Sequence, residues 1–253
     1  MKNPLFLGHS HIHALMRGNV RPKTRRTVFP DAHFLRIQQR RYFPHFSGDQ
    51  SGKMNEELYL DLTSSIADSE IVVSTVFGNE HNVFGLVNHP RPFDFIPKDE
   101  EIVCLDSRAE FVPEKYVYDA LKNRTRSNEM LLLKLRQLAG SSRPIYHIQS
   151  PPPIPSAEHI LSHPEKYGPR LKERGVASKY LRLKLWKLFS HIIQGYCDQS
   201  DILFVATPES AQDSEGFLKE KYWGEDATHG NSLFGAKVLE ELSLKLSVKE
   251  KRN

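Results

Sequence analysis

The sequence predicts a three-layer α/β/α fold with a central parallel sheet of about five strands. Short apolar runs alternate along the chain with amphipathic helical patterns, which favours parallel strands joined by helices. The runs lack apolar–polar alternation, as is typical of strands covered on both faces. No internal repeat and no linker long enough to separate two domains are present, so we expect one domain over residues 1–253.

The five predicted strands are short and rich in β-branched or aromatic residues. They cover residues 4–8, 33–38, 71–77, 144–148 and 201–206. Ligands of open α/β sheets bind outside the carboxyl ends of the strands. Residues that follow these five runs are therefore candidates for a common site.

Four longer segments carry apolar residues every three or four positions, as expected for helices that bury one face. They cover residues 55–67, 113–138, 178–196 and 234–246. The last segment follows Asn231, a residue type that often caps a helix. We expect these helices to cover both faces of the sheet.

Two stretches, residues 81–112 and 150–176, resemble insertions at the edge of the sheet. The first contains Asn88-His89-Pro90-Arg91-Pro92 and has little helical period. The second begins with Pro151-Pro152-Pro153-Ile154-Pro155, which resists helix and central strand because proline lacks the N–H donor. Both follow predicted strand ends, so they are either lids or substrate walls, or ordinary surface loops.

The composition is that of a soluble globular protein, with 39% hydrophobic and 26% charged residues. No apolar run approaches the roughly 20 residues that span a bilayer, so no membrane partner is expected. The amino terminus does not resemble a signal peptide, and we expect a cytoplasmic protein if Met1 is the native start. Cys104 and Cys197 are too few for a disulfide scaffold, and we expect both to be buried fillers.

The net charge of +4 is too small to imply nucleic acid as a partner. The basic residues are nevertheless concentrated in residues 17–41, where Asp31 is the single acid, and in residues 166–187, which hold Glu173 as the only acid. Such clusters are either solvated faces or a rim that attracts an anionic substrate, such as an acidic glycan or a phosphorylated head group.

A serine and a histidine lie where the predicted fold can bring them together. Ser10 follows the first strand, and Asp226 and His229 precede the last helix. A serine hydroxyl is a weak nucleophile that needs an imidazole to take its proton and a carboxylate to orient that imidazole. The simpler interpretation is a helix cap at Ser10, a surface histidine, and an aspartate that favours the dipole of the last helix.

Four segments at these positions resemble, in their order and spacing, the sequence blocks of the SGNH (GDSL-type) hydrolase family. The segments are Gly8-His9-Ser10, Phe46-Ser47-Gly48-Asp49-Gln50-Ser51, Phe77-Gly78-Asn79-Glu80 and Asp226-Ala227-Thr228-His229. Each is short, but together they extend over nearly the whole chain. The resemblance implies a flavodoxin-like fold and a hydrolase that needs neither a cofactor nor a metal.

Carried over position by position, the resemblance implies Ser10 as nucleophile, His229 as general base and Asp226 as the group that holds the imidazole. The oxyanion hole would be formed by the backbone N–H groups of Ser10 and Gly48 and by the side-chain amide of Asn79. Donors aimed at the oxyanion lower the barrier, and loss of one typically costs on the order of 100-fold to 1000-fold in rate.

The sequence departs from the family pattern at several positions. His9 precedes the serine where the family usually has aspartate, and Glu80 follows Asn79 where an aspartate is common. Gly52 lies close to Gly48 and is an alternative for the oxyanion-hole glycine. The departures leave the relay residues in place.

An alternative interpretation uses the alternating His9, His11 and His13. On a strand these imidazoles would share one face, as in the His-x-His of metal-dependent amidohydrolases and phosphoesterases, and imidazole suits zinc, iron or manganese. Further ligands would have to come from His81, His147 and Asp226. The predicted sheet has about five strands, however, and not the eight of a barrel.

Taken together, these observations predict a serine esterase that acts through an acyl-enzyme on a short-chain or O-acetyl carbohydrate ester. The substrate is expected to be a small molecule or a glycan ester, either neutral or anionic, because the chain has two basic clusters and has the aromatic segment 42–46 beside the second block. Acyl transfer to a sugar hydroxyl would use the same residues, and a non-catalytic binding module could share the fold. The oligomeric state is not predicted.

Overall fold

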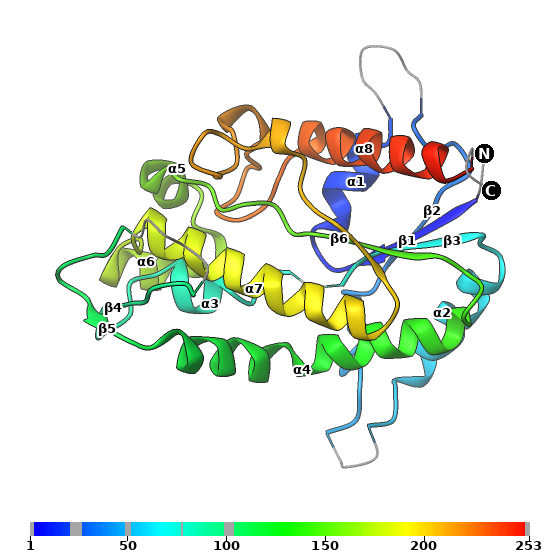
Figure 1. Cartoon of the computed structure of the whole chain (residues 1–253), viewed down its shortest axis with the longest axis horizontal. Helices are drawn as coiled ribbons and strands as arrows, with labels where there is room; N and C mark the ends of the chain where they lie inside the picture. The colour runs from blue at the N-terminus through cyan, green and yellow to red at the C-terminus, as the bar shows by residue number, and fades with distance from the viewer. Residues whose placement is uncertain (1–2, 21–26, 49–51, 77, 99–103, 251–253) are drawn as a thin grey trace.

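Five parallel strands form the central sheet of the computed structural model, which describes residues 3–20, 27–48, 52–76, 78–98 and 104–250 (Figure 1). The strand order is β2-β1-β3-β6-β7, the order of flavodoxin-like folds. The strands are β1 (Pro4–Gly8), β2 (His33–Arg36), β3 (Ile71–Thr75), β6 (Ile145–Ile148) and β7 (Leu203–Val205). All five lie within the predicted runs.

Helices cover both faces of the sheet and complete three layers (Figure 1). One layer contains α1 (Ile12–Gly18) and α8 (Ser232–Glu250). The other contains α2 (Glu56–Ala67), α4 (Glu114–Ala139) and α7 (Lys179–Gln199). The predicted α/β/α architecture is thereby confirmed.

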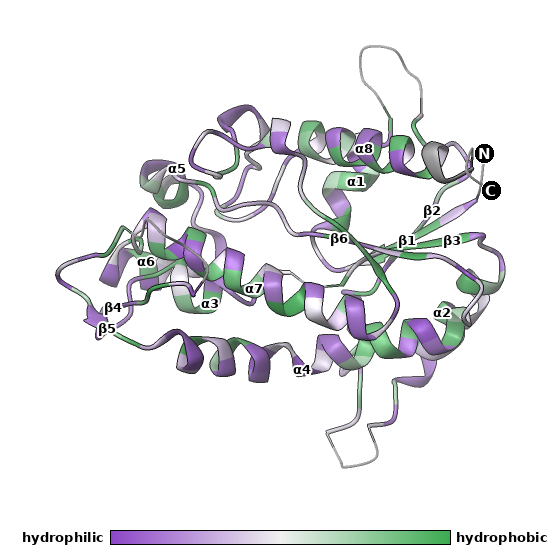
Figure 2. Cartoon of the chain, viewed as in Figure 1, coloured by the Kyte–Doolittle hydropathy of each residue, from purple (hydrophilic) through white to green (hydrophobic). Residues whose placement is uncertain are grey.

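Successive residues of each central strand enter different halves of the core. Leu5 and Leu7 of β1 pack with α2, α4 and α7, whereas Phe6 packs with α1 and α8. All three side chains are fully buried. This two-sided burial explains why the strands show no apolar–polar alternation, while the helices in Figure 2 carry both hydrophilic and hydrophobic residues.

Asparagine side chains cap the amino-terminal ends of α2 and α8. Asn55 accepts a hydrogen bond from the backbone N–H of Leu58 (3.1 Å) at the start of α2. Asn231 accepts from Leu233 (2.9 Å) and Phe234 (3.1 Å) at the start of α8. These caps satisfy donors that have no partner within the helix, and the second fixes the point at which the loop that carries His229 ends.

Two glycines allow α1 and α8 to cross in backbone contact. A Cβ on Gly235 of α8 would lie 1.8 Å from the carbonyl oxygen of Ala14 in α1. A Cβ on Gly18 of α1 would lie 2.2 Å from the backbone nitrogen of Ala236. Larger residues at either position would push the helices apart.

The first insertion, residues 81–112, contains elements too short to produce a sequence period. They are α3 (Asn82–Gly85), β4 (Phe93–Asp94) and β5 (Glu110–Phe111). Strands β4 and β5 pair in parallel as a small separate sheet.

The second insertion, residues 150–176, contains α5 (Ala157–Ser162), a 3-10 turn (Glu165–Tyr167) and α6 (Gly168–Arg174). The insertions are joined by an antiparallel bridge between Val87 and Val176. They form one body at the left of Figure 1.

Two basic residues of the cluster at 166–187 are buried and do not form a rim for substrate. The Nζ atom of Lys184 contacts the Asp94 carboxylate and donates to the carbonyl oxygens of Phe95 and Cys104, at 3.1 Å each. Arg182 donates to the Pro155 carbonyl oxygen (2.9 Å). Both side chains thus tie an insertion to α7, because a buried cation must find acceptors inside the protein.

Of the two cysteines, Cys197 is buried as expected, whereas Cys104 is exposed. Among the described residues, no helix combines the length and apolar character that crossing a membrane requires. The single domain and the cytoplasmic location stay predictions.

Candidate active site

The candidate site lies beyond the carboxyl ends of β1 and β3, where the strand order reverses. Ser10 follows β1, and Gly78 and Asn79 follow β3. A Cβ on Gly8 would lie 1.8 Å from Thr75 Oγ1, so the two strands approach closely at this edge. Such reversal points place the ends of neighbouring strands around one crevice.

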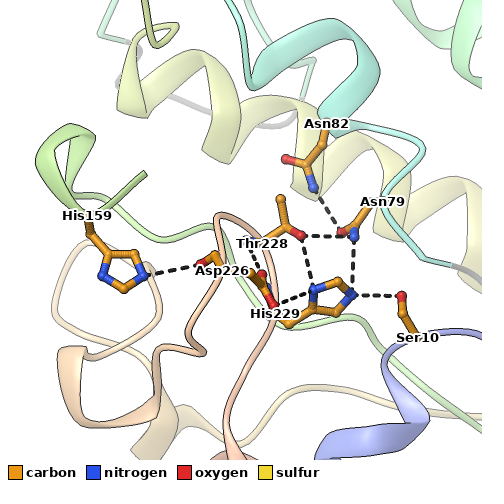
Figure 3. A network of polar contacts seen from close by, with 7 residues as sticks. All are labelled: Ser10, Asn79, Asn82, His159, Asp226, Thr228 and His229. Atoms are coloured by element: carbon orange, nitrogen blue, oxygen red, sulfur yellow. Dashed lines mark hydrogen bonds and ion pairs between the residues drawn. The ribbon is translucent and has the colours of Figure 1, made fainter. Parts of the chain in front are cut away.

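Ser10, His229 and Asp226 form a continuous chain of hydrogen bonds (Figure 3). The hydroxyl oxygen of Ser10 lies 2.7 Å from His229 Nε2. On the far side of the ring, His229 Nδ1 lies 2.9 Å from Asp226 Oδ2. When Nδ1–H donates to the carboxylate, Nε2 is left as an acceptor for the Ser10 proton. The structure therefore brings together the three residues that the sequence analysis selected.

Asp226 also shapes the loop that carries the histidine. Its Oδ1 atom accepts the backbone N–H groups of Thr228 and His229, each at 2.8 Å. An aspartate that bonds its own backbone in this way folds the chain into a tight turn. Because Oδ1 holds the backbone and Oδ2 the imidazole, one carboxylate fixes both the position and the tautomer of His229.

The insertion at 150–176 supports this loop from outside. His159 of α5 donates from Nε2 to the carbonyl oxygen of Asp226 (3.1 Å), as Figure 3 shows. Ala227 is buried with Ile160 and Leu171 of the same insertion. The insertion is therefore part of the frame of the site.

The pKa of Asp226 is set by opposing effects. Burial raises it, but the hydrogen bond and charge of His229, with the backbone N–H donors of Thr228 and His229, lower it by more. The net result holds the pKa of this carboxyl well below its usual range. Asp226 is thus an anion at neutral pH. An ionised carboxylate at this position can stabilise the imidazole of His229 when the ring gains a proton.

Asn79 presents its amide nitrogen to the histidine side of the site. Nδ2 donates to Thr228 Oγ1 (3.0 Å) and lies 3.4 Å from His229 Nε2. Its Oδ1 atom accepts a hydrogen bond from Asn82 Nδ2 (3.0 Å). Asn82 was not selected from the sequence, because the short helix α3 that carries it gives no periodic signal.

Glu80, which follows Asn79, holds the loop after β3 in place. Its Oε2 atom accepts the backbone N–H of Gly78 (2.9 Å), and its Oε1 atom accepts from Asn128 of α4 (2.7 Å). The carboxylate thus ties the loop after β3 both to itself and to a helix of the neighbouring layer.

The structure does not bring Gly48 or Gly52 to the site. The chain leaves the sheet after β2, Phe46 pairs with Met54 in an antiparallel bridge, and Gly48 lies exposed beside it. Gly52 lines a different cavity, against α2 and α4. In Figure 1 the described ends of this segment extend beyond α2 and α4, away from α1. Of the three expected oxyanion donors, only Ser10 and Asn79 lie at the site, and the Ser10 N–H has no acceptor among the described residues.

A cavity of about 520 Å³ opens beside Ser10 and His229. Its described lining is mostly polar and includes His13 and Arg17 of α1, Glu225, and Glu165 of the second insertion. Residues 150–176 thus contribute Glu165 to the lining, whereas no described residue of 81–112 lines this cavity. Glu165 adopts a positive φ of 42°, a strained conformation for a residue with a side chain.

The alternating histidines do not share a strand face. β1 ends at Gly8 and α1 begins at Ile12, so His9, His11 and His13 lie on a turn and a helix. Among the described residues, no group of three or more His, Cys, Asp or Glu side chains is placed to hold a metal ion. The metal-site interpretation assumed that these three histidines share one face of a strand, and this assumption is wrong.

His11 packs against the imidazole ring of His229. The ring centroids of His11 and His229 are 4.6 Å apart. Burial, followed by the charges of His229 and His81, lowers the pKa of His11 well below its usual value. His11 therefore stays neutral beside His229 at neutral pH.

Comparison with known proteins finds similar folds at low identity. The chain matches a proposed acylhydrolase from Bacteroides fragilis at 13% identity, over 99% of this chain and 88% of the other, with a TM-score of 0.47. It matches a GDSL-like lipase from Bacteroides thetaiotaomicron at 12% identity, over 98% and 88% of the two chains, with a TM-score of 0.42. A carbohydrate acetylesterase from Sinorhizobium meliloti is 11% identical over 98% of this chain and 99% of the other, with a TM-score of 0.43. Neither a family model nor a curated protein matches the sequence.

Proposed function

We propose that this protein is a serine esterase that acts through an acyl-enzyme. The observation that carries the proposal is the contact of 2.7 Å between Ser10 Oγ and His229 Nε2, with Asp226 2.9 Å behind the ring. A serine hydroxyl is a weak nucleophile at neutral pH, and an imidazole oriented by a carboxylate activates it by taking its proton.

In the first half of the reaction, His229 Nε2 takes the proton of Ser10 as the oxygen attacks the ester carbonyl. The carbonyl oxygen becomes an oxyanion, and the Ser10 N–H and the Asn79 amide are the donors available to it. The protonated His229 then gives its proton to the departing alcohol, which leaves an acyl group on Ser10. Asp226 stays ionised and stabilises the imidazolium throughout.

In the second half, His229 takes a proton from water, and the hydroxide attacks the acyl group. The acid is released and Ser10 recovers its proton. A sugar hydroxyl in place of water would give acyl transfer with the same residues. The acceptor therefore has to be identified from the products.

We propose a short acyl ester of a polar alcohol, such as an O-acetylated sugar, as the substrate. Among the described residues that line the cavity beside Ser10, Ala14 is the only one with an apolar side chain, so the lining offers a long acyl chain no large apolar side chain to pack against. Glu165 and Glu225 supply acceptors for hydroxyl groups, and Arg17 supplies a cation for an anionic substituent. This mixture of charges suits a neutral polyol as well as an anionic sugar.

Hydrolysis of p-nitrophenyl esters, from acetate to octanoate, and of acetylated glycans tests the proposal. We expect the rate to fall as the chain lengthens and Ser10→Ala to lose on the order of 1000-fold or more. A chelator should leave the rate unchanged, and product analysis separates hydrolysis from acyl transfer.

The control variant Ser64→Ala changes an exposed serine of α2 and should keep the wild-type rate. Unchanged turnover by Ser10→Ala, or activity lost to the chelator, would refute the serine mechanism.

A further inference from the structure

We propose that Asn82 is a positioning residue that keeps the amide nitrogen of Asn79 turned toward the oxyanion. This inference rests on the esterase function proposed above. Asn82 is the first residue of α3, and only 6% of its surface is exposed. Its side chain donates to Asn79 Oδ1 and its backbone N–H to the Asn79 carbonyl oxygen, each at 3.0 Å.

The orientation of an asparagine amide has to be selected by its neighbours. Its nitrogen and oxygen occupy nearly the same space, so a half-turn exchanges a donor for an acceptor. Only the nitrogen can stabilise an oxyanion. Thr228, which contacts this amide, cannot make the selection because a hydroxyl both donates and accepts.

In the resting enzyme the contacts of Asn79 with two neighbours fit the same orientation of its amide. His229 Nε2 carries a lone pair when Nδ1–H bonds Asp226, so it favours the Asn79 nitrogen 3.4 Å away. At the opposite end, the Asn82 amide donates to the Asn79 oxygen.

During the reaction the first of these preferences reverses. Once Nε2 has taken the Ser10 proton it becomes a donor and favours the oxygen of Asn79 over its nitrogen. This happens while the oxyanion forms, when the nitrogen is required. Asn82 then remains as the donor that holds Asn79 Oδ1 away from the site. Its effect therefore belongs to the chemical step and not to substrate binding.

Substitution with aspartate reverses the preference at residue 82. A carboxylate only accepts hydrogen bonds, so Asn82→Asp should draw the Asn79 nitrogen toward itself and leave the oxygen facing the oxyanion. We expect kcat to fall on the order of 100-fold, with KM changed less than about threefold because ground-state contacts persist. Asn82→Leu offers neither donor nor acceptor and should lower kcat less than the aspartate variant.

A double-mutant cycle separates positioning from a general structural role. Asn79→Ala removes the group on which Asn82 acts, so adding either Asn82 substitution to it should cost less than about twofold more. The matched control is Asn123→Asp, which makes the same chemical change at an exposed asparagine of α4. Its kcat should equal that of the wild type.

The results separate this inference from the proposed function. A Ser10-dependent esterase whose kcat is unchanged in Asn82→Asp and Asn82→Leu would overturn the role of Asn82 alone. The role of Asn82 would also be overturned if its substitutions lower kcat by the same factor in the Asn79→Ala background as in the wild type. If Asn82→Asp does not fold, the role of Asn82 is tested with Asn82→Leu and with the double-mutant cycle that combines Asn82→Leu and Asn79→Ala. A wild type without Ser10-dependent turnover would overturn both proposals.

Discussion

Asp226 performs two tasks with two oxygen atoms, and this gives a prediction at the scale of one residue. Asp226→Asn keeps the shape, but its amide nitrogen turned to His229 Nδ1 would favour the tautomer that protonates Nε2. We expect kcat to fall on the order of 10⁴-fold, as such substitutions do in serine triads.

The same chemical change at Asp198, an exposed residue of α7, should leave kcat unchanged. Steady-state kinetics of both variants with p-nitrophenyl acetate provide the measurement. A loss of less than about tenfold in Asp226→Asn would show that this carboxylate does not orient the base.

At the residue scale, the sequence predicted the positions that follow regular elements. Ser10 comes directly after a buried strand, and His229 directly before a capped helix, so strand order alone places them at one edge. The structure places Gly48 away from this edge of the sheet. A short pattern of serine and glycine within a loop does not indicate the path that the loop takes. Asn82 and Glu165 were missed because their roles depend on partners that only the folded chain supplies.

At the scale of elements, the crossing of α1 and α8 positions Ser10 against His229. Gly235→Ala would place a methyl group 1.8 Å from the Ala14 carbonyl oxygen, so the helices must separate. We expect a loss of about 1–3 kcal/mol of stability and a fall in kcat, because the contact between Ser10 and His229 depends on this crossing.

Gly195→Ala in α7 is the matched control, since nothing lies within 4 Å of its added Cβ. That variant should gain about 0.5–1 kcal/mol, since alanine is the better helix former. Urea unfolding and kcat are measured for both variants. If the two substitutions have the same effect, the close crossing does not matter.

The long helices were predictable because each spans several turns and begins at a recognisable cap or proline. Asn55 caps α2, and Pro113 precedes α4. The short elements α3, α5 and α6 were not predictable, because a helical period needs more residues than they contain. These short elements nevertheless carry or support the residues that complete the site.

At the scale of the whole molecule, several buried histidines make stability depend on pH. Burial lowers the pKa of His81 and His147 to about 3, and burial together with His45 lowers that of His9 to about 4. The pKa of His11 is lowered as well, first by burial. The unfolded chain would protonate these rings near pH 6.5, whereas the folded protein keeps them neutral.

Protons therefore bind preferentially to the unfolded state below about pH 6.5. The stability that these groups contribute is present above that pH and is lost as the pH falls toward about 4, at up to about 1.4 kcal/mol per pH unit for each histidine. Asp226 adds to the loss only in stronger acid, because its pKa is lowered from a value near 4.

Urea unfolding between about pH 7.5 and pH 4.5 measures this slope. His81→Leu removes one such proton site, and the slope should become shallower by about 1.4 kcal/mol per pH unit. An unfolding free energy that stays constant between about pH 6.5 and pH 5 would contradict the buried, neutral histidines.

The most direct test of the central claim is covalent labelling of the nucleophile. An alkyl p-nitrophenyl phosphonate reacts with a serine only where a base activates it, and mass spectrometry then locates the label. Cleavage after Lys2 and Arg17 releases residues 3–17, in which Ser10 is the only hydroxyl-bearing residue. We predict one label on this peptide, no label in Ser10→Ala, and labelling slowed at least about 100-fold in His229→Ala. A label on another residue, or an active esterase that the phosphonate leaves unlabelled at Ser10, would contradict the account.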